Sequence, residues 1–174
     1  LVFPEHIVKK LYTAFEQDGE YFKKNGKMMF GAGDAWFWLV SESQDQEGGK
    51  LHSLNTFDES LVAQIVSNAP TGNKSMVVTE ERFVFALGAG GNPRKVQWCD
   101  KEANTVWTPA ATNEAGDFEL QTTGQIMCGL RMRGQTIILT DNDAHIAVYS
   151  GPPFVYGFER VGTACGVASR KSYR

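Results

Sequence analysis

Residues 125–162 read QIMCGLRMRGQTIILTDNDAHIAVYSGPPFVYGFERVG, in which short apolar runs are separated by polar or glycine-containing turns. Within this stretch, residues 134–149 place two apolar runs on either side of Asp141-Asn142-Asp143. Runs rich in β-branched and aromatic residues, interrupted by Asp, Asn or Gly, are typical of antiparallel strands and their turns. The stretch therefore predicts a β-hairpin over residues 134–149 whose turn lies within residues 141–143.

The same pattern occurs twice more, at residues 26–40 (GKMMFGAGDAWFWLV) and 73–87 (NKSMVVTEERFVFAL). Each hairpin pattern has a further apolar run before it and after it. A four-stranded unit that recurs about every 40 to 60 residues is typical of β-propeller blades. We therefore expect an all-β fold of repeated four-stranded antiparallel units packed as propeller-like blades, in one β-rich domain over 1–174. The predicted blade-like units lie near 11–54, 60–99 and 125–162.

Parts of the chain leave alternatives open. Residues 100–124 are predicted as an ordered insertion anchored by Trp107 and Phe118, because the segment is polar but contains aromatic residues. A short helix competes with a strand at Ile7–Phe15 and at Phe57–Val66. Propellers typically have four to eight blades. With three units, either a fourth blade is missing, or the units form an open stack, or other chains complete the sheets.

Composition excludes several classes of protein. The formal net charge of −3 over 174 residues gives no basic footprint for nucleic-acid binding. No apolar run approaches the roughly 18 residues that a membrane span needs, so no membrane partner is predicted. Three widely spaced Cys residues predict buried free thiols rather than a disulfide framework or a zinc site. The chain begins without Met and without a signal-peptide pattern, which favours a processed or truncated chain.

The acidic turn of the third hairpin is a candidate metal site. Asp141, Asp143 and His145 offer ligands, but the spacing lacks the Gly and Glu of a calcium-binding loop. Asp and Asn are also common turn residues, and this interpretation is favoured. We therefore predict neither a functional metal nor a cofactor.

Catalytic patterns are weak. The three histidines have no HExxH spacing, and no nucleophile elbow is present. Asp34, Glu80, Asp100 and Asp143 follow predicted strands in different units, as the two carboxylates of a glycosidase could. Polar turns supply such residues equally well, so we predict that the chain is not an enzyme.

Four segments carry a resemblance to a known family. They are Glu81-Arg82-Phe83, residues 90–94, WTPAATNEAGDF at 107–118 and GPPFVYGFERVGTACG at 151–166. With their surroundings, roughly residues 55–168, they resemble tailed-bacteriophage virion proteins that carry β-propeller-like domains at the tail nozzle or hub. The resemblance implies a structural role in a virion assembled in the bacterial host cytoplasm. It implies other tail subunits and copies of the chain itself as partners, and no catalytic residues.

Six residues are candidates for the contacts of such an assembly: Phe154, Tyr156, Phe158, Arg131, Arg133 and Trp107. Strand alternation would place Phe154, Tyr156 and Phe158 on one face, which needs a cover from another subunit or from the chain's own core. Arg131 and Arg133 also share a face, which is either solvated or opposed to an acidic neighbour or to DNA in a tail channel.

The solvent exposure of Trp107 distinguishes between two predicted functions. In an assembly subunit it would be buried, within the domain or at an interface. In the alternative, a carbohydrate-binding or glycoside-cleaving propeller domain, Trp36, Trp38 and Trp107 would be exposed and stack on sugar rings.

Overall fold

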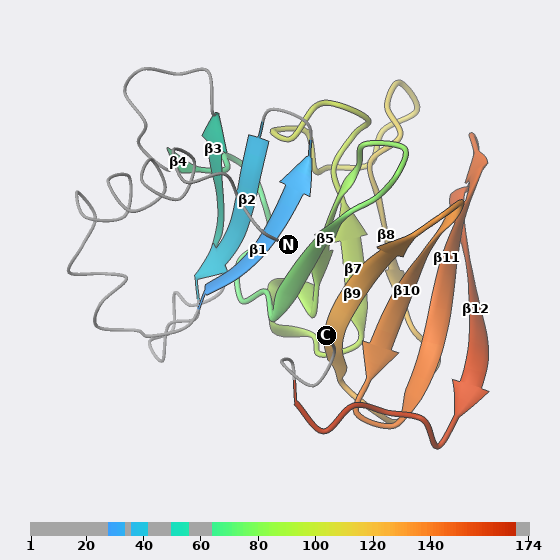
Figure 1. The fold of residues 1–174 in the computed structure, drawn as a ribbon. Helices are drawn as coiled ribbons and strands as arrows, with labels where there is room; N and C mark the ends of the chain where they lie inside the picture. Colours follow the sequence, from blue (N-terminus) through green and yellow to red (C-terminus); the bar gives the residue numbers. More distant parts are fainter. Residues whose placement is uncertain (1–27, 34–35, 42–49, 56–63, 170–174) are drawn as a thin grey trace.

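The computed structural model describes residues 28–33, 36–41, 50–55 and 64–169 (Figure 1). Side chains are described for residues 50, 51 and 65–169. In this described part the regular structure is β-strand, with one short 3-10 turn at Ala89–Gly91 and no α-helix. The prediction of an all-β fold is confirmed.

Among the described residues, twelve strands form three four-stranded antiparallel sheets, each in simple chain order. The first sheet contains β1 (Met28–Gly33), β2 (Trp36–Ser41), β3 (Leu51–Asn55) and β4 (Gln64–Ile65). The second sheet contains β5 (Ser75–Val78), β6 (Val84–Leu87), β7 (Lys95–Trp98) and β8 (Gly116–Glu119). The third sheet contains β9 (Ile126–Met132), β10 (Gln135–Thr140), β11 (Asp143–Gly151) and β12 (Val155–Thr163).

The sheets stack with their first strands side by side: β1 lies next to β5, and β5 lies next to β9 (Figure 1). The later strands of each sheet fan outward from these first strands. As described, the three sheets form an open stack and do not close into a ring.

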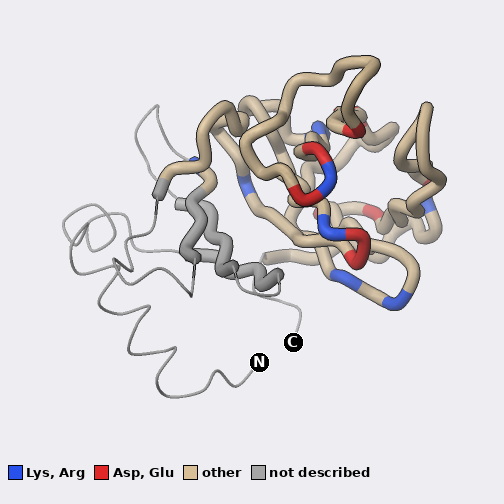
Figure 2. The backbone as a smooth tube through the Cα atoms, turned by 90° about the horizontal axis from the view of Figure 1, so that it is seen from above, with Lys and Arg blue, Asp and Glu red and all other residues tan. Residues whose placement is uncertain are grey.

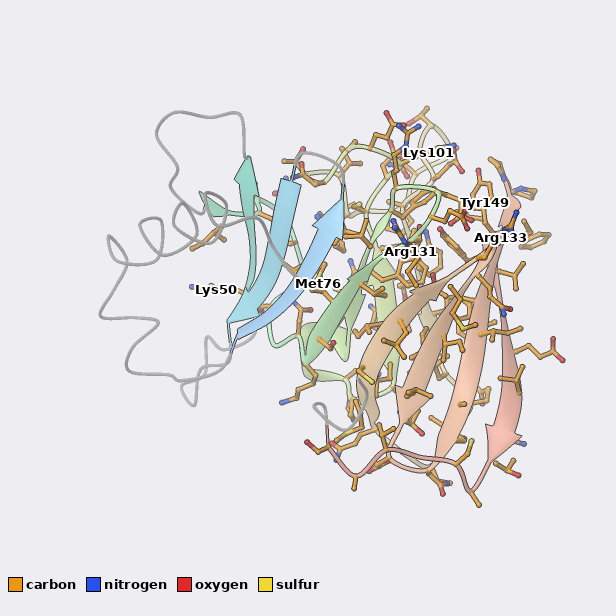
Figure 3. The ribbon with its side chains drawn as sticks, viewed as in Figure 1. Lys50, Met76, Lys101, Arg131, Arg133 and Tyr149 are labelled. Atoms are coloured by element: carbon orange, nitrogen blue, oxygen red, sulfur yellow. The ribbon has the colours of Figure 1, made fainter. Side chains whose placement is uncertain are left out.

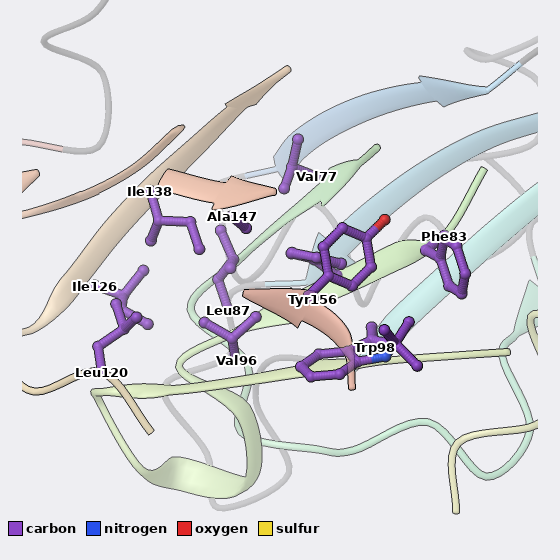
Figure 4. Packing of buried hydrophobic residues seen from close by; sticks show 12 residues of the cluster. Val77, Phe83, Leu87, Val96, Trp98, Leu120, Ile126, Ile138, Ala147 and Tyr156 are labelled. Carbon is purple, nitrogen blue, oxygen red and sulfur yellow. The ribbon is translucent and has the colours of Figure 1, made fainter. Parts of the chain in front are cut away.

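The second sheet is the centre of the stack because both of its faces are buried. Its strands β5 and β6 are buried at every position. Alternate residues such as Val77 and Leu87 join a cluster with Ile138 and Tyr156 of the third sheet (Figure 4). The other set, including Val78, packs on the opposite side with Leu51 of the first sheet. Burial on both faces explains why residues 76–78 of β5 and all of β6 are continuously apolar rather than alternating.

The hairpin over residues 134–149 is confirmed. β10 pairs with β11 in antiparallel register, with Ile137 opposite Ile146 and Leu139 opposite Ala144. The turn lies at residues 141–142, within the predicted limits. The third unit, predicted near 125–162, matches the third sheet.

The limits of the first two units were wrong. The apolar run at 61–66 contains β4, which pairs with β3 and ends the first sheet instead of beginning the second. Residues 100–124 contain β8, the fourth strand of the second sheet, which pairs with β7. β8 is an outermost strand with three exposed residues in four, so it lacks the apolar pattern of the inner strands. The strand expected at 11–15 lies outside the described residues, as does most of the helix alternative at 57–66.

Short segments return the chain from each outermost strand to the first strand of the next sheet. In the segment 120–125, Leu120 N donates to Arg94 O, and Ile126 N then donates to Pro93 O. After β12 the chain turns back in the same way, and Val167 N donates to Thr140 O at 2.9 Å. The described residues contain no helix that is long and apolar enough to span a membrane.

Candidate functional site

Trp107 is a core residue rather than an exposed platform. It lies in the loop between β7 and β8, with only 1% of its surface exposed. Its indole N–H donates to Asn104 O, and its backbone carbonyl accepts from Gln97 Nε2. The ring packs in the cluster that joins the first and second sheets. Trp107 therefore has no free ring face on which a sugar could stack. The side chains of Trp36 and Trp38 lie outside the described residues.

The three aromatic residues around the β11–β12 turn do not share a face. Tyr156 is buried in the cluster between the second and third sheets, and Phe158 packs against that cluster. Phe154 is 82% exposed in the turn before β12. The register shifts between Tyr149 and Gly151, and Val155 adopts φ +60°, so simple alternation does not extend back to Phe154. The chain's own core covers two of the three rings.

Phe158 extends the core to the sheet edge. Its ring stacks on that of Phe118 of β8, with centroids 4.6 Å apart and planes inclined by 3°. Phe118 is 37% exposed, so this pair closes the gap between the outer strands of the second and third sheets. Sequence reasoning treated Phe118 as a loop anchor and missed this contact, because the pairing of β8 was not recognised.

The β5–β6 and β9–β10 turns lie at one end of the sheets, which we call the loop end. Arg131 and Arg133 are exposed there, and Figure 3 shows both near the end of β9. Glu80 Oε2 of the β5–β6 turn accepts from Gly134 N at 2.6 Å, which ties the two turns together. Figure 2 shows acidic and basic positions interspersed in the described part of the chain, rather than a field of one sign. The arginines are therefore single exposed cations and not part of a basic stripe.

Two tyrosine–carboxylate pairs also lie at the loop end. The Tyr149 hydroxyl donates to Glu114 Oε2 at 2.7 Å, and the Tyr156 hydroxyl donates to Glu81 Oε2 at 3.0 Å. The ring centroids of the two tyrosines are 5.5 Å apart. The hydrogen bond to Glu114 raises the pKa of Tyr149, and burial raises that of Tyr156. Both hydroxyls therefore stay protonated at neutral pH and link the second sheet to the third.

The predicted acidic turn contains a buried polar network. Asp143 and His145 are each 3% exposed, and His145 Nε2 lies 3.1 Å from Asp143 Oδ1. The hydroxyls of Thr122 and Thr140 also donate to the Asp143 carboxylate. Burial alone would raise the pKa of Asp143, but these hydroxyl donors and His145 hold it below its ordinary value.

Asp141 does not join this network. It is exposed, and its Oδ1 accepts from Gln125 N at 2.9 Å. Within the described residues no three His, Cys, Asp or Glu side chains come together as a metal-binding group. Sequence reasoning assigned these residues to a hairpin turn and did not predict that Asp143 is buried. Thr140, three residues before Asp143, is the only local signal in the sequence, because Thr122 reaches the turn from 21 residues away.

The described carboxylates among those considered for glycoside hydrolysis do not all lie at one end of the sheets. Glu80 and Asp100 lie at the loop end, where Asp100 Oδ1 accepts from Glu114 N at 2.8 Å. Asp143 begins β11 beside the β10–β11 turn, at the other end of the third sheet. Asp34 lies outside the described residues. The expectation that these carboxylates converge on one face is therefore wrong for Asp143.

The third sheet has an apolar face that points away from the second sheet, which we call the outer face. Gly129 faces the second sheet, since a Cβ there would lie 2.8 Å from Leu87 and Val77 side-chain atoms. Its neighbours in sequence and their cross-strand partners face the other way. The outer-face residues that are half-buried or exposed are Leu130, Met132, Ile137, Leu139, Ile146 and Val148, whereas Cys128 on the same face is fully buried. The outer face is mainly aliphatic, with Glu159 on β12 at its margin.

No protein-family model matches the chain, and neither a curated protein nor a solved structure is significantly similar to it.

Proposed function

We propose that this chain is a structural, non-catalytic component of a bacteriophage tail, of the nozzle or hub type. In this proposal it acts by assembly with copies of itself and with other tail proteins, within a virion assembled in the bacterial cytoplasm. Its sheets would act as propeller-like blades, that is, as rigid plates that stack through their faces.

The observation that carries this proposal is the outer face of the third sheet. Inside the chain, the faces of the second sheet are covered by neighbouring sheets and form two apolar clusters. The outer face is also apolar, although aliphatic where those clusters are rich in aromatic rings, yet Met132 is 46% and Val148 is 40% exposed. A contiguous apolar face that remains exposed on a folded domain is typical of an interaction surface. A domain whose sheets pack face to face, and whose third sheet has an exposed apolar outer face, is suited to assembly.

Two further observations agree with this role. The segments that resemble tail proteins include most of β8 and the whole of β12, both of which contribute to the stacking of the second sheet on the third. Arg131 and Arg133, exposed at the loop end, are available for an acidic neighbour or for passive contact with DNA in a tail channel. The alternative of a carbohydrate-binding propeller loses the support of Trp107, because that ring is buried.

The experiment is to purify the phage whose genome encodes this chain and to analyse its tails by mass spectrometry and electron cryomicroscopy. We expect the chain in purified particles at a fixed copy number, with density for four-stranded sheets at the nozzle or hub. A chain that is absent from purified particles would overturn the proposal. A glycan array probed with the purified chain provides the contrast, since the carbohydrate-binding alternative requires specific binding there.

A further inference from the structure

The outer face of the third sheet is covered at one end and open at the other. Cys128 of β9 is 0% exposed. It points away from the second sheet, because it alternates along the strand with Gly129, which faces the second sheet. Toward the loop end of the same face, Met132 is 46% and Val148 is 40% exposed. The cover therefore lies beside the beginning of β9 and does not extend to the loop end.

The chain that follows β12 turns onto this outer face. Gly162 of β12 is aligned with Ala144 of β11, which is aligned in turn with Leu139 of the outer face. A Cβ at Gly162 would lie 2.5 Å from Cys165 Sγ. Cys165 therefore packs on the outer side of β12, and residues 164–169 begin their course on that side.

The segment then passes the β10–β11 turn in the direction of β9. A Cβ at Gly166 would clash with the backbone of Asp141, so the segment lies directly against this turn. Val167 N donates to Thr140 O at 2.9 Å. Thr140 pairs with Ile126 at the beginning of β9. The segment has thus crossed the end of the sheet from β12 to β10, and β9 is the next strand in its path.

The same course leads into a first strand elsewhere in the chain. After β8, residues 120–125 pass the β6–β7 turn. Ile126 N donates to Pro93 O of that turn at 2.8 Å and begins β9, which lies beside β5 (Figure 1). Val167 N makes the corresponding bond to Thr140 O, beside the β10–β11 turn. Val167 therefore occupies the position at which the first strand of a further sheet would begin.

We infer that the chain from Val167 onward runs beside β9 as the first strand of a fourth sheet and covers Cys128. This strand lies on the side of β9 that faces away from β5, as β9 lies beside β5 and β5 lies beside β1. In each described sheet the first strand pairs with the second strand of the same sheet. A first strand seated beside β9 therefore offers an edge to which a further strand can be added. The inference does not depend on the proposed function.

The test measures how fast Cys128 reacts with N-ethylmaleimide under native conditions. The chain over residues 1–174 carries Cys165→Ser, because Cys165 is exposed and would react first. Burial raises the pKa of Cys99 to about 12 and that of Cys128 to about 11, so both thiols react slowly while they are covered. Peptide mass spectrometry follows the two thiols separately. Cys99 packs in the cluster between the first and second sheets and therefore reports whether a variant stays folded.

Val167→Pro removes the N–H group that bonds Thr140, and a proline at this position should release the segment. Cys128 should then react at least about tenfold faster while Cys99 stays protected. Val167→Ala is the matched control, because it keeps the N–H group at the same position. It should change the rate at Cys128 by less than about threefold.

Two further variants complete the test. Val148→Cys places a thiol on the open part of the outer face and should react rapidly in the otherwise intact chain. Equal protection of this thiol and Cys128 would contradict a cover confined to β9. A chain that ends at Gly166 replaces Val167→Pro if the proline variant also exposes Cys99. It should show the same rapid reaction at Cys128.

Three other results would overturn the inference. The first is rapid reaction of Cys128 in the intact chain, which would mean that nothing covers it in solution. The second is protection that survives both the proline and the removal of residues 167–174, which would assign the cover to another part of the chain. The third is protection that is lost on dilution, which would assign the cover to a second copy. None of these results bears on the presence of the chain in phage tails, so the proposed function is tested separately.

Discussion

The Thr122 hydroxyl lies 2.9 Å and 2.8 Å from the two carboxylate oxygens of Asp143. Thr122 belongs to the segment that connects the second sheet to the third, and Asp143 begins β11. The contact therefore fixes that connecting segment against the β10–β11 turn. Because all of these groups are buried, their hydrogen bonds stabilise the fold more than equivalent bonds at the surface would.

Asp143→Asn should destabilise the protein by about 2 kcal/mol or more, because it replaces one of the two buried acceptor oxygens with an NH2 donor that faces the hydroxyl donors of Thr122 and Thr140. Asp141→Asn is the matched control, since Asp141 is exposed and an Asn oxygen can still accept from Gln125 N. It should change the free energy of unfolding by no more than about 0.5 kcal/mol. Urea unfolding of the two variants measures both values. Equal effects would contradict the structural role of Asp143.

The same carboxylate makes stability depend on acidic pH. The pKa of Asp143 in the folded protein is below its ordinary value of 3.8. Its stabilising contribution is therefore present in full above that ordinary value and is lost as the pH falls through the lower folded-state pKa. The wild type should lose more stability than Asp143→Asn between about pH 5 and pH 2. Parallel slopes of unfolding free energy against pH for the two proteins would contradict this prediction.

Tyr156→Phe tests the link between the second and third sheets. The substitution keeps the ring contacts with Phe83 and Phe85 but removes the hydroxyl that bonds Thr79 and Glu81. We expect a loss of about 1 to 3 kcal/mol in the free energy of unfolding at neutral pH. Tyr149→Phe is the control: its hydroxyl also bonds a carboxylate, but the residue is only half-buried, and the loss should be smaller.

Alkaline pH provides a second measurement on Tyr156. Burial raises its pKa in the folded protein above the ordinary value of 10. The stability that follows from this shift is present in full below pH 10 and falls as the pH rises further, because only the unfolded state ionises there. The stability difference between wild type and Tyr156→Phe should therefore narrow above pH 10. A constant difference up to the alkaline unfolding point would argue against a buried, neutral hydroxyl.

The sequence predicts strands well where apolar runs and turn residues alternate. The hairpin of β10 and β11 was predicted with its turn because Ile137, Ile138 and Leu139 lie between clear turn signals. The outermost strand β8 was missed, since an edge strand packs on fewer neighbours and therefore carries Asp117 and Glu119. Its assignment depends on its pairing with β7, which local patterns do not encode.

The polar features were harder to predict than the strands. Asp141 and Asp143 are two residues apart in one turn and look equivalent in sequence, yet one is exposed and the other is buried. The difference arises from Thr122, which reaches the turn from a different part of the chain. The position of Phe154 could not be predicted either, because the register shift before β12 interrupts strand alternation.

The close approach of β5 and β9 can be tested at Gly129. A Cβ at this position would lie 2.8 Å from Leu87 Cδ1 and from Val77 Cγ1, closer than packed carbon atoms can lie. Gly129→Ala should therefore cost about 1 to 3 kcal/mol through overpacking of the interface between the second and third sheets. Gly157→Ala on β12 is the matched control, since the nearest atom to a Cβ there is Val148 O at 4.0 Å.

A double-mutant cycle locates the cause of any loss at Gly129. If the added methyl group clashes with Val77, then Val77→Ala should remove part of the cost of Gly129→Ala, so that the double variant is more stable than additivity predicts. Chemical unfolding of the single and double variants gives the coupling energy. Strict additivity, or a Gly129→Ala variant as stable as the wild type, would contradict this prediction. It would mean that β5 and β9 lie too far apart for a Cβ at Gly129 to clash with Val77.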